Sequence, residues 1–228
     1  MISIIIPTFN ESKNITVLVE RVKASLFQPY ELIIVDDASP DGTGAIAERL
    51  ALDHPIKIVH RKAKLGLASA VLEGFKVASG ELFCVIDSDL SHPPEIIPLL
   101  IKDLEKQRAD IIIASRFIKG SCVEFWPKIR LWGTNVAMLT VAPLTRVKDP
   151  MSGFFILKSK VVEDAELIPR GFKILLEILV KAKYKKAVEY PFVFIDRVYG
   201  SSKLNLGTYL IFIVQLFDLY LWKIKSIL

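Results

Sequence analysis

The sequence has few cysteines and lacks several widespread motifs. Its 228 residues include two cysteines, Cys84 and Cys122, which are too few for a disulfide framework and are typical of a reducing compartment such as the cytosol. The N-terminus opens on an apolar run with no charged segment before it, so we expect no signal peptide. There is no G-x-G-x-x-G after the first apolar run and no G-x-x-x-x-G-K-[ST] anywhere. A dinucleotide dehydrogenase and a P-loop NTPase are therefore disfavoured.

Acidic and basic residues are distributed unevenly. Residues 1–114 contain 12 Lys and Arg against 16 Asp and Glu, whereas residues 115–228 contain 18 against 9. The basic half carries no helix-turn-helix, zinc-finger or RNP pattern, so nucleic acid is not an expected partner. An acidic half that holds a metal ion and a basic half that faces anions fit this distribution. Hydrophobic residues make up 52% of the chain, which suggests contact with a membrane.

Apolar runs alternate with helical patterns over the first half of the chain. We expect strands at 2–6, 31–35, 56–60, 82–86 and 111–115, and helices at 13–26, 43–52, 66–79 and 94–107. Ser12 is the expected N-cap of the first helix. This alternation predicts βαβ units, and therefore an α/β fold with a mainly parallel sheet flanked by helices. Later in the chain we expect a loop at 119–124, helices at 126–141 and 172–183, and strands at 154–158 and 187–195.

Acidic residues follow three of the expected strands or their loops. They are Glu11, Asp36, Asp37, Asp87 and Asp89. The carboxyl ends of parallel strands lie at one edge of a sheet, where ligands bind in open α/β folds, so we expect these residues to lie close together. Such a cluster is costly without a cation or hydrogen-bond donors to offset the repulsion. The alternative is that each acid caps the helix that follows it.

The pair Asp87 and Asp89 is the main candidate for a metal site. Both follow the apolar run at 82–86, which predicts a buried strand bounded by Gly80. Mg²⁺ and Mn²⁺ bind one or two carboxylates together with substrate phosphates, so the pair suits a metal–diphosphate site. The alternative is two loop acids that cap a helix beginning at Pro93 and Pro94.

Four cations of the basic half lie at expected strand ends and in loops: Arg116, Arg130, Arg197 and Lys203. The segment 197–203 places Arg and Lys around a Gly-Ser-Ser centre, where backbone N–H groups can approach a phosphate. A surface salt bridge is the alternative for each cation taken singly. Together they favour an anion site.

The segment 207–222 is apolar and is interrupted by Gln215 and Asp218. As a helix it would be about 24 Å long, shorter than the ~30 Å hydrocarbon core of a bilayer. We therefore expect a helix that lies in the membrane interface. Its expected lipid contacts are Tyr209, Tyr220, Trp222, Lys223 and Lys225. A core helix and the start of a spanning segment are the alternatives.

Seven motifs occur in order along residues 2–206. They are PTFNE at 7–11, VDDASPDGT at 35–43, KLGLASA-x-x-x-G at 64–74, DSDLSHPPE at 87–95, ASRFIKG at 114–120, DPMSGF at 149–154 and R-x-x-G-x-SKL at 197–204. This series resembles the polyprenyl-phosphate sugar synthases, and more narrowly the dolichol-phosphate mannose synthases, of the family 2 glycosyltransferases. Two features depart from the family: Ser91 stands where some relatives carry Gln, and some relatives extend into several membrane helices.

The resemblance implies a GT-A fold over residues 1–206, with a nucleotide-sugar half at 1–115, an acceptor half at 116–206 and a membrane-associating helix at 207–228. It implies an enzyme that uses Mg²⁺ or Mn²⁺ to transfer mannose from GDP-mannose to a polyprenyl or dolichyl monophosphate. With the expected reducing compartment and the expected interfacial helix, we expect this enzyme at the cytoplasmic face of a membrane. The implied donor contacts are Pro7, Phe9, Glu11, Asp36, Asp37, Asp87, Ser88 and Asp89, of which Asp87 and Asp89 hold the metal. The implied contacts of the acceptor phosphate are Arg116, Arg130, Thr134, Arg197 and Lys203.

The implied catalytic residues are Asp89, Arg116, Arg130, Arg197 and Asp149. A lipid monophosphate is largely dianionic at neutral pH and can attack the anomeric carbon without a base, with inversion. We therefore expect Asp149 to position an arginine or to bind the sugar. Three alternatives remain open: UDP-glucose as the donor, a hydroxyl acceptor with Asp149 as the base, and a nucleotide-sugar binder without activity.

Overall fold

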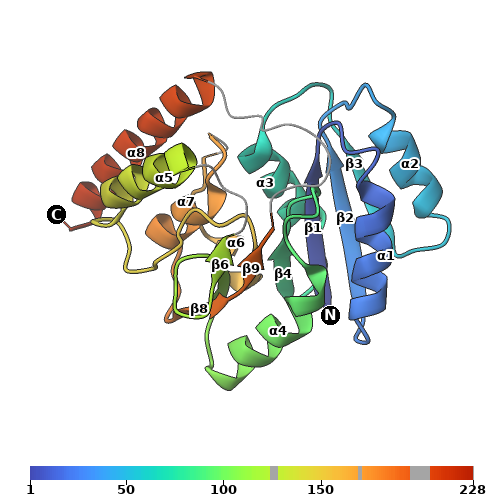
Figure 1. The fold of residues 1–228 in the computed structure, drawn as a ribbon, viewed down its shortest axis with the longest axis horizontal. Helices are drawn as coiled ribbons and strands as arrows, with labels where there is room; N and C mark the ends of the chain where they lie inside the picture. Colours follow the sequence, from blue (N-terminus) through green and yellow to red (C-terminus); the bar gives the residue numbers. More distant parts are fainter. Residues whose placement is uncertain (124–127, 169–170, 196–205, 228) are drawn as a thin grey trace.

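A seven-stranded sheet with the order β3-β2-β1-β4-β7-β5-β8 forms the centre of the molecule (Figure 1). The structure is a computed structural model that describes residues 1–123, 128–168, 171–195 and 206–227. The strands are β1 (Ile2–Thr8), β2 (Tyr30–Asp36), β3 (Ile56–His60), β4 (Leu82–Val85), β5 (Ile111–Ser115), β7 (Phe155–Lys158) and β8 (Ala187–Pro191). All neighbours pair in parallel except β7, which runs antiparallel between β4 and β5. The expected mainly parallel sheet is confirmed.

Helices cover both faces of this sheet. They are α1 (Ile15–Ser25), α2 (Thr43–Leu50), α3 (Leu67–Val77), η1 (Pro94–Ile96), α4 (Ile97–Lys106), α5 (Lys128–Val141), α6 (Lys160–Glu163), α7 (Ile174–Lys181) and α8 (Leu206–Ile227). Successive side chains of a strand point to opposite faces. Ile4 and Ile6 of β1 therefore join the core beneath α1 and α4, whereas Ile5 joins the core beneath α3 and α7. β1 is buried on both faces, as its run of isoleucines predicts.

Three local expectations need correction. The N-cap of α1 is Asn14, and Ser12 instead donates its backbone N–H to Asp41 Oδ2 at 3.0 Å. The strand expected at 187–195 is interrupted at Phe192, beyond which β9 (Val193–Phe194) leaves the main sheet. β9 pairs with β6 (Cys122–Val123), a strand within the expected loop. The short helix α6 was not expected either. The division of the domain at residue 115 stays a prediction, although strands from both sides of it share one sheet.

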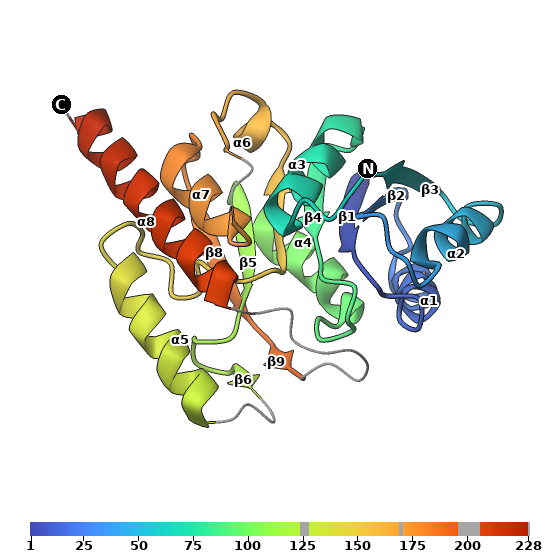
Figure 2. The same cartoon turned by 90° about the horizontal axis from the view of Figure 1, so that it is seen from above.

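The C-terminal helix α8 lies beside α5 and α7, as both views show (Figures 1 and 2). Phe212, Gln215 and Leu219 face the protein and are buried. Gln215 Nε2 donates a hydrogen bond to the Lys173 carbonyl at 3.3 Å, and its Oε1 is buried without a hydrogen-bond partner among the described residues. The opposite side exposes Leu210, Ile213, Val214, Phe217, Leu221 and Ile224, and Tyr209 and Ile211 are exposed near the start of the helix. The buried Gln215 thus faces the protein between two buried apolar residues, and most of the exposed apolar side chains of α8 face outward.

Two of the residues that were expected to contact lipid instead bind the end of α5 or the segment just after it. The Tyr220 hydroxyl donates to the Thr140 carbonyl at 2.7 Å, and Lys223 Nζ donates to the Pro143 carbonyl at 2.7 Å. α8 is also longer than the expected 16 residues: its 22 residues correspond to about 33 Å. Residues 207–226 are long and apolar enough to form a membrane-spanning helix, by length and composition alone. Length therefore does not distinguish a helix in the interface from one that crosses the bilayer.

Candidate functional site

A cavity of about 530 Å³ lies at the carboxyl edge of β1, β2 and β4. Eight residues expected to act at the site line it: Pro7, Phe9, Glu11, Asp37, Asp87, Ser88, Asp89 and Arg116. The expectation that the acids meet at one sheet edge is borne out by the position of Glu11, Asp37, Asp87 and Asp89. Asp36 is the exception. Its carboxylate is buried and accepts hydrogen bonds from Thr8 and Ser39, so it closes the loop after β2 instead of facing the cavity.

Backbone strain is concentrated in the loops that carry these acids. Asn10, Ala38 and Leu90 have φ values of 57°, 54° and 64°, in the left-handed region that residues other than glycine rarely adopt. Each lies next to an expected site residue, and each follows a different strand of the same edge. Such strain persists where the surrounding structure enforces it, and it is common at ligand sites.

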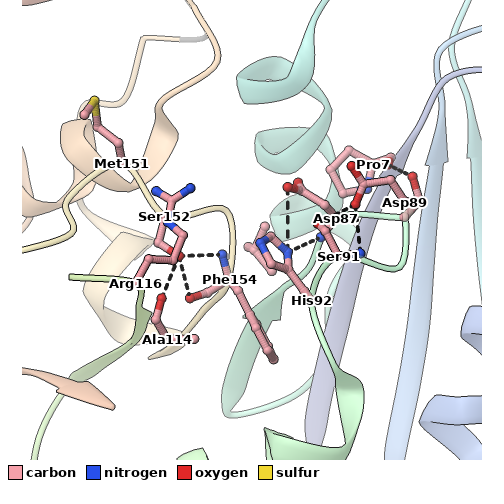
Figure 3. A network of polar contacts seen from close by, with 12 residues as sticks. Pro7, Asp87, Asp89, Ser91, His92, Ala114, Arg116, Met151, Ser152 and Phe154 are labelled. Atoms are coloured by element: carbon pink, nitrogen blue, oxygen red, sulfur yellow. Dashed lines mark hydrogen bonds and ion pairs between the residues drawn. The ribbon is translucent and has the colours of Figure 1, made fainter. Parts of the chain in front are cut away.

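Asp87 and Asp89 are held differently although only one residue separates them. Asp89 Oδ1 accepts hydrogen bonds from the backbone N–H and the hydroxyl of Ser91, at 3.1 and 2.6 Å (Figure 3). Ser91 therefore orients Asp89. Burial raises the pKa of Asp87, and the negative charge of Asp89 raises it further. A cation between the two carboxylates would relieve both effects.

The donor set fits a divalent metal that is shared with a substrate. Within the described parts of the chain, no group of three or more His, Cys, Asp or Glu side chains could hold a metal ion. Two carboxylates that face one cavity match Mg²⁺ or Mn²⁺, which take their remaining ligands from phosphates and water. The assignment of Asp87 and Asp89 to the metal stays a prediction.

His92 lies behind Asp87 in an aromatic environment. Its ring is 5.3 Å from Phe154, 6.0 Å from Phe192 and 5.7 Å from Phe194, measured between ring centroids. Burial lowers its pKa, against the opposing effect of Asp87, and Nδ1 accepts the backbone N–H of Asp87 at 3.3 Å. His92 is thus a neutral acceptor that holds the backbone of the Asp-x-Asp segment.

Arg116 and Asp149 form a buried pair on the other side of the site from Asp89 (Figure 3 shows Arg116). Asp149 Oδ2 accepts hydrogen bonds from Nε and from the backbone N–H of Arg116, at 2.8 and 2.9 Å. Asp149 Oδ1 accepts a hydrogen bond from Arg116 Nη2 at 2.8 Å. Asp149 has no exposed surface and does not line the cavity, whereas Arg116 does. This geometry suits a carboxylate that positions an arginine, as expected, more than one that removes a proton.

Asp37 and Phe9 form the wall at which a nucleoside is expected. The Asp37 carboxylate forms an ion pair with Arg61 at 2.6 Å and accepts hydrogen bonds from the backbone N–H groups of Leu65 and Gly66 at 3.1 and 3.0 Å. Asp37 therefore fixes the loop before α3. Lys64 of this loop places its ammonium 4.3 Å from the centre of the Phe9 ring.

The expected acceptor residues are only partly covered by the described structure. Arg197 and Lys203 lie outside the described residues. Arg130 lies on α5, where its side chain is not described, and Thr134 is a half-buried residue of the same helix that does not line the cavity. The roles of all four stay predictions.

Several cavity residues were not expected from the sequence. Lys173 places Nζ 3.2 Å from the Met151 carbonyl, and its charge lowers the pKa of Asp87 against the stronger effect of burial. Gly153 and Thr208 also line the cavity. A single Lys before an apolar helix carries no signal of its own, because the same pattern occurs at the ends of many surface helices. Lys64 stands in a quoted motif but was not singled out.

Comparison with known proteins identifies the family. The sequence profile described as Glycosyl transferase family 2 matches residues 3–165. The chain is 45% identical over 227 residues to a dolichol-phosphate mannosyltransferase of Pyrococcus furiosus, covering 97% of this chain and 64% of that protein. It is 36% identical over 235 residues to the dolichol-phosphate mannosyltransferase of Saccharomyces cerevisiae, covering 97% of this chain and 87% of that protein. The chain thus spans a little under two thirds of the length of the Pyrococcus furiosus relative.

Solved structures share the fold at low sequence identity. Mannosyl-3-phosphoglycerate synthase from Rubrobacter xylanophilus matches with a TM-score of 0.67 and 15% identity, over 99% of this chain and 75% of its own. Glucosyl-3-phosphoglycerate synthase from Mycobacterium tuberculosis, in complex with Mn²⁺, UDP and glucosyl-3-phosphoglycerate, matches with a TM-score of 0.66 and 19% identity, over 98% and 79%. The expected GT-A fold is confirmed.

Proposed function

Because the chain belongs to glycosyl transferase family 2, we propose that it transfers mannose from GDP-mannose to a polyprenyl monophosphate such as dolichyl phosphate, with inversion. The observation that carries this proposal is the composition of the cavity. The carboxylates of Asp87 and Asp89, the cations of Arg116 and Lys173, and Thr208 of the apolar helix α8 all line the same space. These residues support adjacent sites for a metal-bound diphosphate and for an anionic acceptor, and Ile211 beside Thr208 supports an apolar approach for its lipid chain.

The residues divide the work between the two anionic substrates. Asp87 and Asp89 would hold Mg²⁺ or Mn²⁺, which supplies positive charge to the diphosphate that leaves. Arg116 would hold the acceptor phosphate, because a guanidinium binds phosphate bidentately and keeps its charge at all relevant pH values. Arg130, Thr134, Arg197 and Lys203 are the further proposed contacts of that phosphate.

No base is needed for this reaction. The acceptor phosphate attacks the anomeric carbon through an oxygen that is already ionised, so the protein has to bring two anions together and hold them in line. Asp149 then acts through Arg116, and its three hydrogen bonds from that residue leave it poorly placed to accept a proton from a hydroxyl acceptor.

Membrane attachment at the cytoplasmic face is part of the proposal. α8 carries eight large exposed hydrophobic residues, most of them on its outward side, and Leu139 of the neighbouring α5 is also strongly exposed. A surface of this size in water would be costly, and contact with a bilayer removes it from water. Thr208 and Ile211, at the start of α8, line the cavity, so a lipid phosphate could enter from the surface that the helix contacts.

A transfer assay tests the proposed function. The full chain with Mn²⁺ is incubated with radiolabelled GDP-mannose or UDP-glucose, with and without a short polyprenyl phosphate, and label in the organic phase is counted. We expect label only with GDP-mannose and lipid. Asp89→Asn should give at least about a hundredfold less label, because the metal loses a carboxylate ligand and the charge that develops on the leaving diphosphate is then less well stabilised. Asp53→Asn, which removes an exposed carboxylate elsewhere, serves as the control and should keep full activity.

Each of the other outcomes has a defined meaning. Label from UDP-glucose alone would retain the mechanism and change the sugar. No label in lipid from either donor, with folded protein that binds nucleotide, would refute the lipid acceptor. Equal activity of Asp89→Asn and the unmodified chain would refute the metal assignment.

A further inference from the structure

Gly153 lies against the carboxylate of Asp87. A Cβ atom at residue 153 would lie 2.7 Å from Asp87 Oδ2, 3.0 Å from Oδ1 and 3.1 Å from Cγ. Carbon atoms do not approach one another or a carboxylate oxygen this closely without a displacement. A side chain of any size at residue 153 would therefore collide with the group expected to bind the metal.

The backbone at residue 153 does not itself require glycine. The glycines with positive φ in the described chain are Gly42, Gly66, Gly120 and Gly171, and Gly153 is not among them. Alanine could adopt the same backbone conformation, so the collision with Asp87 is the specific obstacle to a side chain. Gly171 differs in this respect, because its φ of +76° would strain alanine whatever the space.

The loop on which Gly153 lies is firmly held. The Ser152 hydroxyl donates to the Ala114 carbonyl at 2.8 Å and accepts the backbone N–H of Phe154 at 3.1 Å (Figure 3). Phe154 is fully buried beside His92. Any movement of the loop away from Asp87 would disturb these contacts with β5 and with the core.

The backbone of Asp87 is also held, by His92. Its backbone N–H donates to His92 Nδ1 at 3.3 Å, and its Oδ2 lies 3.7 Å from the same nitrogen. His92 is buried to 1% exposure and cannot move without repacking three phenylalanine rings. The carboxylate thus lies between the bare backbone of Gly153 and a fixed imidazole, and rotation of its own side chain is the easiest response to a new methyl group.

From these contacts we infer that Gly153 is a positioning residue of the metal site, whose missing side chain defines where the Asp87 carboxylate can lie. The inference rests on the metal-dependent function proposed above. Mg²⁺ requires nearly ideal octahedral ligand geometry, so a carboxylate that is rotated by a methyl group binds it less well. Changes behind a metal ligand typically cost about 10- to 100-fold in metal affinity or activity.

The test measures metal binding directly. Mn²⁺ is titrated into the full chain, alone and with GDP, and free Mn²⁺ is quantified by electron paramagnetic resonance. Gly153→Ala should raise the Kd for Mn²⁺ by about 10- to 100-fold. Unchanged Mn²⁺ affinity in folded Gly153→Ala would overturn the inference, and so would an unmodified chain that binds no Mn²⁺.

Two other glycines provide matched controls. A Cβ atom at Gly133 on α5 would have no described atom within 4 Å, so Gly133→Ala should leave Mn²⁺ binding unchanged and raise the Tm slightly. Gly74 on α3 would place a Cβ 2.5 Å from Ile5 Cγ2 in the core, so Gly74→Ala should lower the Tm and leave the Mn²⁺ affinity of the folded protein unchanged. A selective loss of metal affinity in Gly153→Ala alone would separate a site effect from general destabilisation.

A double-mutant cycle covers the case in which Gly153→Ala folds poorly. If the methyl group acts through Asp87, its effect on the Tm should largely disappear in the Asp87→Ala background. An equal Tm loss in both backgrounds would overturn the inference. The result is also independent of the substrate: a chain that binds Mn²⁺ and shows the Gly153 effect, but transfers no label to lipid, would contradict the proposed function and leave Gly153 in its role.

Discussion

Replacement of Asp149 by Asn should separate two roles of this residue, a general base and a carboxylate that positions Arg116. Asn keeps the shape of the side chain and one acceptor oxygen, but it removes the charge. Three hydrogen bonds from Arg116 converge on the carboxylate, two of them from the guanidinium. Asp149 is fully buried, and the Arg116 side chain is only 10% exposed. The substitution therefore leaves a largely buried guanidinium without its counterion.

The expected loss of stability is large. Removing one partner of a buried ion pair costs about 3–5 kcal/mol, because the remaining charge stays buried. In a domain of this size 1 kcal/mol shifts the Tm by about 2–4 °C, so Asp149→Asn should lower the Tm by about 10 °C. Replacing both residues, with Arg116→Met in addition, should restore part of this loss, because the unpaired charge is removed.

Transfer kinetics complete the test. A misplaced Arg116 should raise the KM for polyprenyl phosphate about tenfold or more, since a charge-assisted hydrogen bond contributes about 1.5–3 kcal/mol. The dependence of kcat on pH should keep its shape, because no proton is transferred. Calorimetry and a transfer assay between pH 5 and 9 would measure both effects. An unchanged Tm, together with loss of the acidic limb of the pH profile, would show that Asp149 is a base and refute the reasoning.

Three further predictions concern other parts of the molecule. Burial raises the pKa of Glu31, but hydrogen bonds, chiefly from Lys57, outweigh this effect and lower the pKa to about 2. The ionised Glu31 therefore stabilises the fold above pH 4.5, and this stabilisation is lost as the pH falls towards 2. Glu31→Gln should cost about 2 kcal/mol in urea unfolding at pH 7 and make the loss of stability with acid shallower, and equal acid sensitivity of both proteins would contradict this. Lys173→Met should raise the KM for the nucleotide sugar about tenfold in steady-state transfer assays and leave the KM for the lipid unchanged. The reason is that the charge of Lys173 acts on Asp87, the carboxylate proposed to hold the metal and diphosphate. A raised KM for the lipid alone would instead assign Lys173 to the acceptor. Phe217→Glu on the outward side of α8 should weaken flotation with anionic vesicles at least about tenfold, whereas Val17→Glu, at an exposed apolar position of α1, should leave it unchanged; equal flotation of all three proteins would exclude this face as the membrane contact.

The parts of the fold that depend on local pattern could be predicted from the sequence. The alternating segments up to residue 115 follow from apolar periodicity, and Asp87 and Asp89 could be placed at the ligand-binding edge because their strand is parallel to its neighbour β1. The insertion of β7 between β4 and β5 could not be predicted. Its four residues are almost entirely buried on both faces, and this pattern fits any interior position and either direction.

Individual contacts across the site were equally hidden. Gly153 stands in a quoted motif, yet only the structure shows that the Asp87 carboxylate occupies the space of its side chain. Asp36 and Asp37 are adjacent and alike in sequence, but one closes a loop and the other faces the cavity. Ser12 is a good N-cap type, but its backbone N–H is bound by Asp41, and the helix begins later. Each of these outcomes depends at least in part on a residue distant in the chain (Asp87, Thr8 and Asp41 respectively), which periodicity does not report.

The buried Gln215 has a consequence for how the C-terminal helix can be oriented. Its amide is the polar group of α8 that contacts the loop before α7, through Lys173, and a rotation of the helix by one residue (~100°) would remove this hydrogen bond. Gly171 leaves room for its Oε1, since a Cβ there would lie 2.7 Å from that oxygen. A single buried polar residue can fix the register of a helix in this way at some expense in stability. Gln215 therefore helps to fix the rotation of α8 about its own axis. This rotation decides how the cavity entrance is oriented relative to the surface that the helix contacts.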